Sequence, residues 1–283
     1  MTEIEKVPLS VVIMTFNEEL NVEHCLRWVH GWADEIFVVD SFSTDQTLDI
    51  VRRYTDLVFQ HAYEGHSQQW NWALQSLPFN NSWVLALDAD FSVTPELREA
   101  ITQVVSVDDP NIDGYYVRHR QIFRGRFIRH GTIYPRYWLR LFRRQKVYID
   151  EHDLVDLHFY VKGGTGRLEY DVIEDNRKER EIAFWIEKQI RFAKQQAVEE
   201  LQRRTGSTST PVPPKFFGTP NQRTLWLKNL WYRLPLYVRP FLYFLYRYIL
   251  RLGFLDGKEG FLYHFTQAFL YRLLVDVQLE ERQ

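Results

Sequence analysis

The first hundred residues alternate between short apolar runs and stretches with helical periodicity. Short, almost wholly apolar runs are typical of strands buried on both faces of a parallel sheet. Between the runs, apolar residues recur at the spacing of one helix face. Repeated strand–helix units predict a parallel sheet with right-handed crossovers. The expected strands are residues 9–14, 35–39, 57–59 and 83–88, each followed by a helix.

Beyond residue 115 the pattern changes. Residues 114–118 and 138–143 are predicted as strands that extend the sheet into a mixed one. One long amphipathic helix is expected over residues 179–204, with an apolar face made of Ile182, Trp185, Ile186, Ala193, Ala197 and Leu201.

The remaining segments complete the expected fold. Residues 205–222 are rich in Ser, Thr, Pro and Gly, which indicates a linker. Residues 223–283 are predicted as an aromatic and basic tail of two or three helices. The expected fold class is therefore α/β, a Rossmann-like, mostly parallel sheet flanked by helices, with a C-terminal helical extension.

Composition narrows the class of protein. Hydrophobic residues make up 45% of the chain and charged residues 25%, as in ordinary globular proteins. The formal net charge is −2 at pH 7, so we expect no nucleic-acid partner. The single cysteine, Cys25, excludes an internal disulfide and fits a reducing cytoplasm. No apolar run reaches the about 20 residues that span a bilayer, and we expect no signal peptide.

Polar residues follow three of the predicted strands. Ligands of parallel α/β sheets bind beyond the carboxyl ends of the strands, where helix N-termini also favour anions. Two of these residues, Asp88 and Asp90, form a carboxylate pair of the kind that a hard divalent cation bridging to phosphates would need. The sequence thus predicts a metal-assisted nucleotide-phosphate site, although simple caps and turns remain an alternative. The residues at the strand ends are Thr15, Asn17 and Glu18, then Asp40, then Asp88 and Asp90.

Several common signatures are absent from the sequence. No Gly-x-Gly-x-x-Gly follows the first strand and no Gly-x-x-x-x-Gly-Lys-Ser/Thr occurs, which argues against a Rossmann dehydrogenase and a P-loop NTPase. The sequence also lacks His-Glu-x-x-His and any cysteine cluster, which argues against a zinc site.

Three segments, residues 10–19, 38–47 and 87–90, resemble the inverting glycosyltransferases of family 2, which have the GT-A fold. The group that builds lipopolysaccharide cores and exopolysaccharides is the most similar, and the resemblance covers residues 9–178. It implies a GT-A catalytic domain over residues 1–178, a nucleotide-sugar donor, and Asp90 as the ligand of Mg²⁺ or Mn²⁺. The metal would neutralise charge on the leaving nucleoside diphosphate. The donor-binding residues that it implies are Thr15, Asn17, Glu18, Asp40, Ser43 and Asp88.

An inverting displacement needs a general base that deprotonates the acceptor hydroxyl. The resemblance places this base in an acidic cluster, with Glu151 as the first candidate. A different alignment leaves Asp153 or Asp156 as the base, and a solvated acidic loop is the third possibility. The chain departs from its relatives at Trp70, where they carry Arg or Lys, and at Phe91, which we expect to pack against donor or acceptor.

The tail at residues 223–283 interleaves aromatic and basic side chains. Helices of this composition suit a membrane interface, where rings lie at headgroup depth and cations meet anionic lipid. A helical cap on the catalytic domain is the alternative. We expect a cytoplasmic protein that is peripheral on the inner face of the cell membrane.

The expected function is transfer of a sugar, with inversion, from a nucleotide-sugar donor to a glycan or lipid-linked acceptor in lipopolysaccharide or exopolysaccharide biosynthesis. One alternative is a catalytically silent scaffold that binds glycan or membrane through a degenerate glycosyltransferase domain. Another is a sugar nucleotidyltransferase, which should need a basic, glycine-rich signature loop that the sequence lacks.

Overall fold

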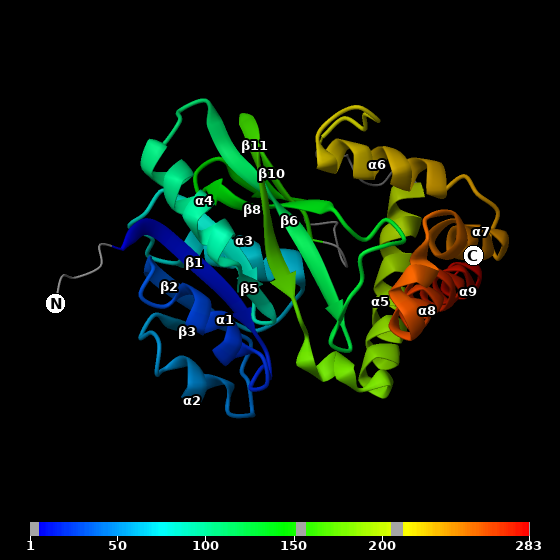
Figure 1. Cartoon of the computed structure of the whole chain (residues 1–283), viewed down its shortest axis with the longest axis horizontal. Coiled ribbons are helices and arrows are strands. Elements are labelled where there is room, and N and C mark those ends of the chain that lie inside the picture. Colours follow the sequence, from blue (N-terminus) through cyan, green and yellow to red (C-terminus); the bar gives the residue numbers. More distant parts are fainter. Residues whose placement is uncertain (1–5, 151–156, 205–211, 283) are drawn as a thin grey trace. The chain divides into compact units, whose positions relative to one another are not determined.

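The computed structural model describes residues 6–150, 157–204 and 212–282 (Figure 1). Contacts among these residues divide the chain into two compact units. The first unit consists of the described residues up to 119 together with 137–149 and 159–177, and the second contains the others. The first unit ends at residue 177, and residues 120–136 group with the C-terminal helices.

A mixed sheet forms most of the first unit. Its strands are β1 (Val7–Thr15), β2 (Ala33–Asp40), β3 (Val58–Gln60), β4 (Trp83–Asp88), β5 (Phe91–Val93), β6 (Ile112–Phe123), β7 (Arg126–Phe127), β8 (Arg136–Arg143) and β11 (Gly164–Glu174). In the described part of the chain the order is β3-β2-β1-β4-β8-β6-β11-β5, with β7 paired to β6. The pairs among β3, β2, β1 and β4 are parallel, as predicted, whereas β8 pairs with β4 and β5 pairs with β11 in antiparallel fashion. A separate antiparallel pair is formed by β9 (Val147–Ile149) and β10 (Phe159–Val161).

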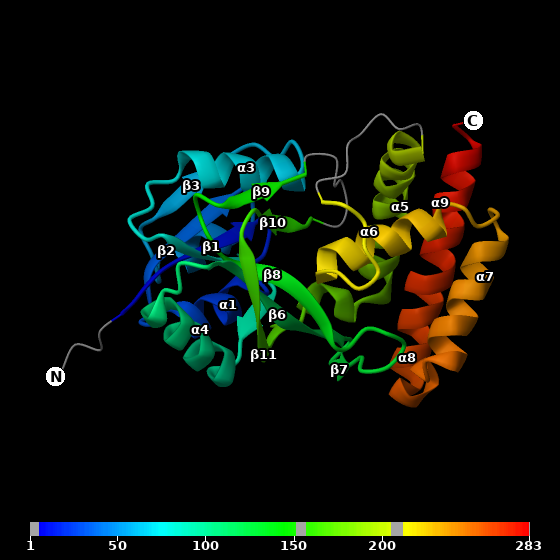
Figure 2. The ribbon, with the colours of Figure 1, turned by 90° about the horizontal axis from the view of Figure 1, so that it is seen from above.

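Helices cover both faces of this sheet (Figure 2). On one face, α1 (Val22–Val29), α2 (Thr47–Val51) and α4 (Pro95–Val107) share a hydrophobic core with Val11 and Ile13 of β1. On the other face, Trp70 of α3 (His66–Ser76) packs edge-on against Phe159, which in turn packs on Phe142. The central strands are mostly apolar because each of their faces lies under helices.

The second unit is mainly helical. Its helices are α5 (Ile182–Arg204), α6 (Pro220–Trp231), α7 (Val238–Leu245), the π-helix η2 (Tyr246–Leu250), the 3₁₀-helix η3 (Gly253–Asp256), α8 (Gly257–His264), the π-helix η4 (Phe265–Leu270) and α9 (Tyr271–Glu280). Helix α9 lies beside α5 and α7 (Figure 2). None of the helices in the described ranges combines the length and the apolar character that a membrane span requires.

A hairpin explains why residues 120–136 belong to the second unit. Phe123 of β6 packs with Ile128 and Ile133 on Trp185 of α5 and Tyr263 of α8. These side chains form a hydrophobic core separate from that of the sheet. A pattern of strands along the sequence does not reveal to which of two cores a long strand contributes its end.

Two predicted boundaries and one predicted face are corrected. The helix expected from residue 179 starts at Ile182, after the 3₁₀ turn η1 (Arg177–Arg180). The expected linker ends at Thr219, because its hydroxyl caps α6. On α5, Ile182 is exposed while Glu200 is buried. Burial of this carboxylate is possible because Arg204 and Arg239 pair with it.

Candidate functional site

The strand register brings the predicted strand ends together. Thr15 at the end of β1 lies opposite Asp40 at the end of β2, and Met14 lies opposite Asp88 at the end of β4. All of these strands are parallel, so their carboxyl ends share one edge of the sheet. The structure therefore gathers at this edge the carboxylates that the sequence spaces up to fifty residues apart.

Asp40 is fully buried and its carboxylate accepts hydrogen bonds from three neighbouring segments. The hydroxyl of Thr15 donates to Oδ1 at 3.1 Å, and the backbone N–H of Ser43 donates to Oδ2 at 2.9 Å. The side-chain amide of Gln60, at the end of β3, donates to Oδ2 at 3.2 Å. The carboxylate thus fixes the loop that follows β2 against β1 and β3.

The loops after β1 and β2 are also joined directly. The Asn17 N–H donates to the Ser43 hydroxyl at 2.8 Å, and the Thr44 N–H donates to Oδ1 of Asn17 at 2.8 Å. The Glu18 N–H donates to the Thr47 hydroxyl at 2.7 Å. Asn17 has a φ of +52°, a left-handed conformation that Asn tolerates better than most residues. Asn17 and Ser43 therefore shape the turn, as the cap-and-turn alternative anticipated.

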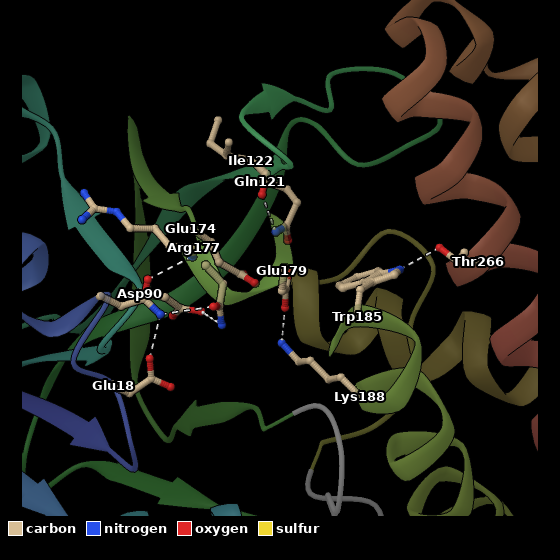
Figure 3. A network of polar contacts seen from close by, with 12 residues as sticks. Glu18, Asp90, Gln121, Ile122, Glu174, Arg177, Glu179, Trp185, Lys188 and Thr266 are labelled. Atoms are coloured by element: carbon tan, nitrogen blue, oxygen red, sulfur yellow. Dashed lines mark hydrogen bonds and ion pairs between the residues drawn. The ribbon is translucent and has the colours of Figure 1, made fainter. Parts of the chain in front are cut away.

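A chain of amide hydrogen bonds connects Glu18 with Asp90 (Figure 3). The side-chain amide of Asn21 donates to Glu18 Oε2 at 2.7 Å and to Asn176 Oδ1 at 3.1 Å. The amide of Asn176 donates in turn to Asp90 Oδ2 at 3.0 Å. Because its oxygen accepts from Asn21, the Asn176 amide must point its NH₂ group at Asp90. Asn176 is a site residue that the sequence analysis missed.

The carboxylate of Asp88 is bracketed by two basic side chains. Arg140 Nη2 lies 3.1 Å from Oδ2, and His66 Nε2 lies 3.8 Å from Oδ1. Arg140 is buried, and its guanidinium lies over the ring of Phe91 at 4.9 Å. Among the described residues, its Nη1 has no hydrogen-bond partner. Burial lowers the pKa of His66, so this imidazole is neutral at pH 7 and Arg140 carries the compensating charge.

Two departures from the family pattern have a structural explanation. Trp70 is fully buried against Phe159, so its position contributes to the core. Phe91 is also buried and packs beneath Arg140, which corrects the expectation that its ring faces the donor or acceptor. An exposed ring is found instead at Phe42, whose φ of +61° is uncommon for a bulky residue.

The three candidates for the general base, Glu151, Asp153 and Asp156, lie outside the described residues. The residue that precedes them, Asp150, is buried, and its Oδ2 lies 3.1 Å from Arg203 Nη2 on α5. This pairing holds the Asp150 side chain against α5.

The residues at the sheet edge fit a metal ion that is shared with a ligand. Within the described ranges, no three His, Cys, Asp or Glu side chains come close enough together to hold a metal by themselves. Mg²⁺ and similar ions are commonly bound by one or two carboxylates together with substrate phosphates and water. Asp90 is half-buried and offers one such carboxylate, which the Asn176 amide orients.

Comparison with known proteins identifies the family. Residues 10–168, more than half of the chain, match the sequence profile described as Glycosyl transferase family 2. The chain belongs to this family. The matched range includes the donor-binding and metal-binding residues proposed from the sequence. Family membership and the parallel strands with their flanking helices agree with the predicted GT-A fold class.

The relatives include a lipopolysaccharide core biosynthesis glycosyltransferase, LpsC of Rhizobium meliloti, which is 30% identical over 168 residues, or 58% of this chain and 61% of LpsC. The chain thus spans less than two thirds of this curated relative. Among solved structures, S. aureus TarS (residues 1–349) in complex with UDP-GlcNAc matches 98% of this chain and 91% of its own, with 15% identity and a TM-score of 0.47. Glucosyl-3-phosphoglycerate synthase from Mycobacterium tuberculosis, in complex with Mn²⁺ and UDP-glucose, matches 40% of this chain and 43% of its own, with 22% identity and a TM-score of 0.33.

Proposed function

We propose that this protein transfers a sugar, with inversion, from a nucleotide-sugar donor to a glycan or lipid-linked acceptor of lipopolysaccharide or exopolysaccharide biosynthesis. The observation that carries the proposal is the gathering of Asp40, Asp88 and Asp90 at the carboxyl edge of parallel strands in a family 2 domain. The name of the relative LpsC supports the choice of pathway.

The donor nucleotide binds over the loops that Asp40 holds together. Thr15, Asn17, Glu18 and Ser43 hold these two turns together by hydrogen bonds and so shape the surface on which the nucleotide would lie. The exposed ring of Phe42 offers an apolar surface on which a nucleobase can stack.

The two carboxylates after β4 divide their tasks. Asp88 already pairs with the Arg140 guanidinium, which makes it the poorer ligand for a cation and leaves it to orient the donor's sugar or ribose. Asp90 binds the Mg²⁺ or Mn²⁺ that neutralises the donor diphosphate. Asn176 holds Asp90 for this task.

Glu151, Asp153 or Asp156 supplies the general base, and Glu151 is the first choice. Conversion of each residue to its amide distinguishes them, because loss of a general base lowers kcat by about 10² to 10⁴-fold and leaves donor binding intact. An acceptor that is lipid-linked implies action at the inner face of the membrane, with residues 223–283 as the part of the chain that meets it.

The test uses the purified full chain with a panel of nucleoside-diphosphate sugars in Mn²⁺, Mg²⁺ or EDTA. We expect release of nucleoside diphosphate from one donor class, and we expect this release to require the metal. The metal-dependent release should be lost in Asp90→Asn. NMR of the anomeric proton in the product reports inversion. If the protein neither binds nor turns over any donor of the panel, the non-catalytic scaffold is favoured instead.

A further inference from the structure

One face of the second unit exposes an unusually continuous set of large apolar side chains. Along α7 and η2 they recur at helical spacing, and each is about half exposed or more: Val238, Phe241, Leu242, Leu245, Ile249 and Leu250. Single exposed apolar residues are ordinary, whereas a contiguous apolar patch of this kind marks an interaction surface. We call these six residues the apolar ridge.

The apolar ridge continues onto the neighbouring helices. Aromatic contacts join α7 and η2 to α8 and η4, with ring centroids 4.6 Å apart for Phe241 and Phe269 and 5.7 Å apart for Tyr248 and Phe261. Phe254, Leu255 and Phe261 are themselves more than a third exposed. These helices thus pack on one another through their aromatic side chains, and the ridge remains exposed on their outer side.

Two exposed basic side chains follow the apolar ridge along the chain. From residue 238 to residue 265, the charged side chains in the exposed class are Arg251 and Lys258. The acids of this segment are less exposed: Asp256 is buried against His130, and Glu259 is half-buried. Beyond residue 265, Glu280 and Glu281 are exposed acids of the described chain, and the Glu280 carboxylate accepts a hydrogen bond from the Tyr237 hydroxyl, next to the first residue of the ridge.

We infer that the apolar ridge, with Arg251 and Lys258, is a docking surface for a bilayer of anionic phospholipid. Apolar side chains that enter the headgroup region and cations that meet anionic headgroups are the two contributions that hold interfacial helices on such membranes. A second copy of the chain is the other candidate occupant, and the experiment below distinguishes it from a bilayer. The inference rests on the proposed function only for its purpose, access to a lipid-linked acceptor.

Flotation of the full chain with lipid vesicles tests the inference. We expect binding to vesicles of phosphatidylcholine with phosphatidylglycerol and little binding to phosphatidylcholine alone. Leu245→Gln with Ile249→Gln should lower the affinity at least about tenfold, because two apolar side chains no longer leave water. Arg251→Gln with Lys258→Gln should lower it about tenfold on the anionic vesicles only. All four side chains are exposed, so thermal unfolding should match that of the wild type.

A matched control and a second readout keep the test specific. Val107, at the end of α4 in the first unit, is 75% exposed, and Val107→Gln should bind vesicles like the wild type. The native Cys25 is buried, and burial raises the pKa of its thiol, so a thiol-reactive dye labels an introduced cysteine instead. A polarity-sensitive dye on Leu245→Cys should shift to the blue with anionic vesicles, whereas the dye on Val107→Cys should not.

The inference is overturned if the wild type does not float with anionic vesicles, or if the Leu245→Gln/Ile249→Gln variant binds them as well as the wild type does. It is also overturned if light scattering shows a wild-type dimer that this variant abolishes, since a second copy would then be the occupant. Intact vesicle binding without any sugar transfer would instead refute the proposed function and leave the docking surface in place.

Discussion

Asp40 is the residue on which the nucleotide end of the candidate site depends. Its buried carboxylate accepts hydrogen bonds from Thr15, Ser43 and Gln60, so a substitution here affects both the fold and ligand binding. In Asp40→Asn an NH₂ group faces these donors, and a buried donor loses its acceptor. We expect the free energy of unfolding to fall by about 1–3 kcal/mol and binding of the donor's nucleoside diphosphate to weaken. Urea unfolding and calorimetric titration with that nucleoside diphosphate measure the two effects.

The control for this substitution is Asp49→Asn. Asp49 is a largely exposed residue of α2 that pairs with Arg52 only at 3.8 Å. Its conversion should leave stability and binding of the nucleoside diphosphate within error of the wild type. Equal effects of the two substitutions would contradict the role assigned to Asp40.

Asn176 acts on the metal through Asp90. In Asn176→Ala the Asp90 carboxylate loses the amide that orients it, and loss of such a partner typically costs about 10 to 100-fold in metal affinity. We therefore expect weaker binding of the donor's nucleoside diphosphate in the presence of Mn²⁺ and unchanged binding in EDTA, both measured by calorimetry. Asn111→Ala, in an exposed turn, is the matched control. A variant that loses affinity for the nucleoside diphosphate equally with and without metal would show a merely structural role.

At the scale of elements, the sequence pattern predicts the sheet well and the contacts between its ends less well. The apolar runs of β1, β2 and β4 identify parallel strands, and parallel pairing alone brings Asp40 and Asp88 to one edge. Asn176 was not predicted because it reaches Asp90 through the antiparallel pairing of β11 with β5, in which Glu174 lies opposite Phe91. That pairing depends on chain reversals that periodicity does not encode.

Apart from Ile182, the predicted apolar face of α5 packs into hydrophobic cores, but a buried acid on this helix was missed for a similar reason. Helical periodicity assigns charged residues to solvent, yet Glu200 is buried because Arg239, far along the chain, pairs with it at 2.7 Å. Asp276 of α9 pairs with the same guanidinium. A one-dimensional pattern cannot show a partner that arrives from another helix. The general base also stays a prediction, because its three candidates fall outside the described residues.

Helix α8 ends with a buried histidine that should make stability depend on pH. Neither ring nitrogen of His264 has a hydrogen-bond partner in the described part of the chain. Burial, together with Arg247, lowers its pKa to about 3. The unfolded chain takes up this proton near pH 6.5, so folding stability is lost as the pH falls from about 6.5 towards 3. Between pH 7 and pH 5 we expect His264 to account for a loss of about 2 kcal/mol.

The measurement is urea unfolding at both pH values. His264→Leu replaces the ring with an apolar side chain that binds no proton, and its stability should fall by about 2 kcal/mol less than that of the wild type over this range. His30→Gln, at an exposed position after α1, should retain the wild-type pH dependence. If His264→Leu loses as much stability between pH 7 and pH 5 as the wild type does, the imidazole takes up its proton in the folded protein over this range as well.

At the scale of the whole molecule, deletion of residues 223–283 is a poor test of membrane binding. This segment contributes Tyr263 to the core with Phe123 and Trp185, and it contributes α9 to the core with α5. Its removal would expose apolar surface on α5 and on the β6–β7 hairpin, and such surface can itself adsorb to lipid. Point substitutions on the apolar ridge avoid this difficulty because those side chains are already exposed.

The direction in which salt changes the affinity for anionic vesicles tests the membrane proposal. The formal net charge is −2, so the protein as a whole is repelled by an anionic membrane, and attraction has to come from the local field of Arg251 and Lys258. An increase of salt from about 0.1 M to about 1 M shortens the Debye length from about 10 Å to about 3 Å. If the local cations dominate, salt lowers the affinity for anionic vesicles; if the net charge dominates, salt raises it. In flotation assays we expect salt to lower the affinity of the wild type for anionic vesicles. The affinity of Arg251→Gln/Lys258→Gln should depend less on salt. Leu245→Gln/Ile249→Gln should start from a lower affinity but show the same salt dependence as the wild type.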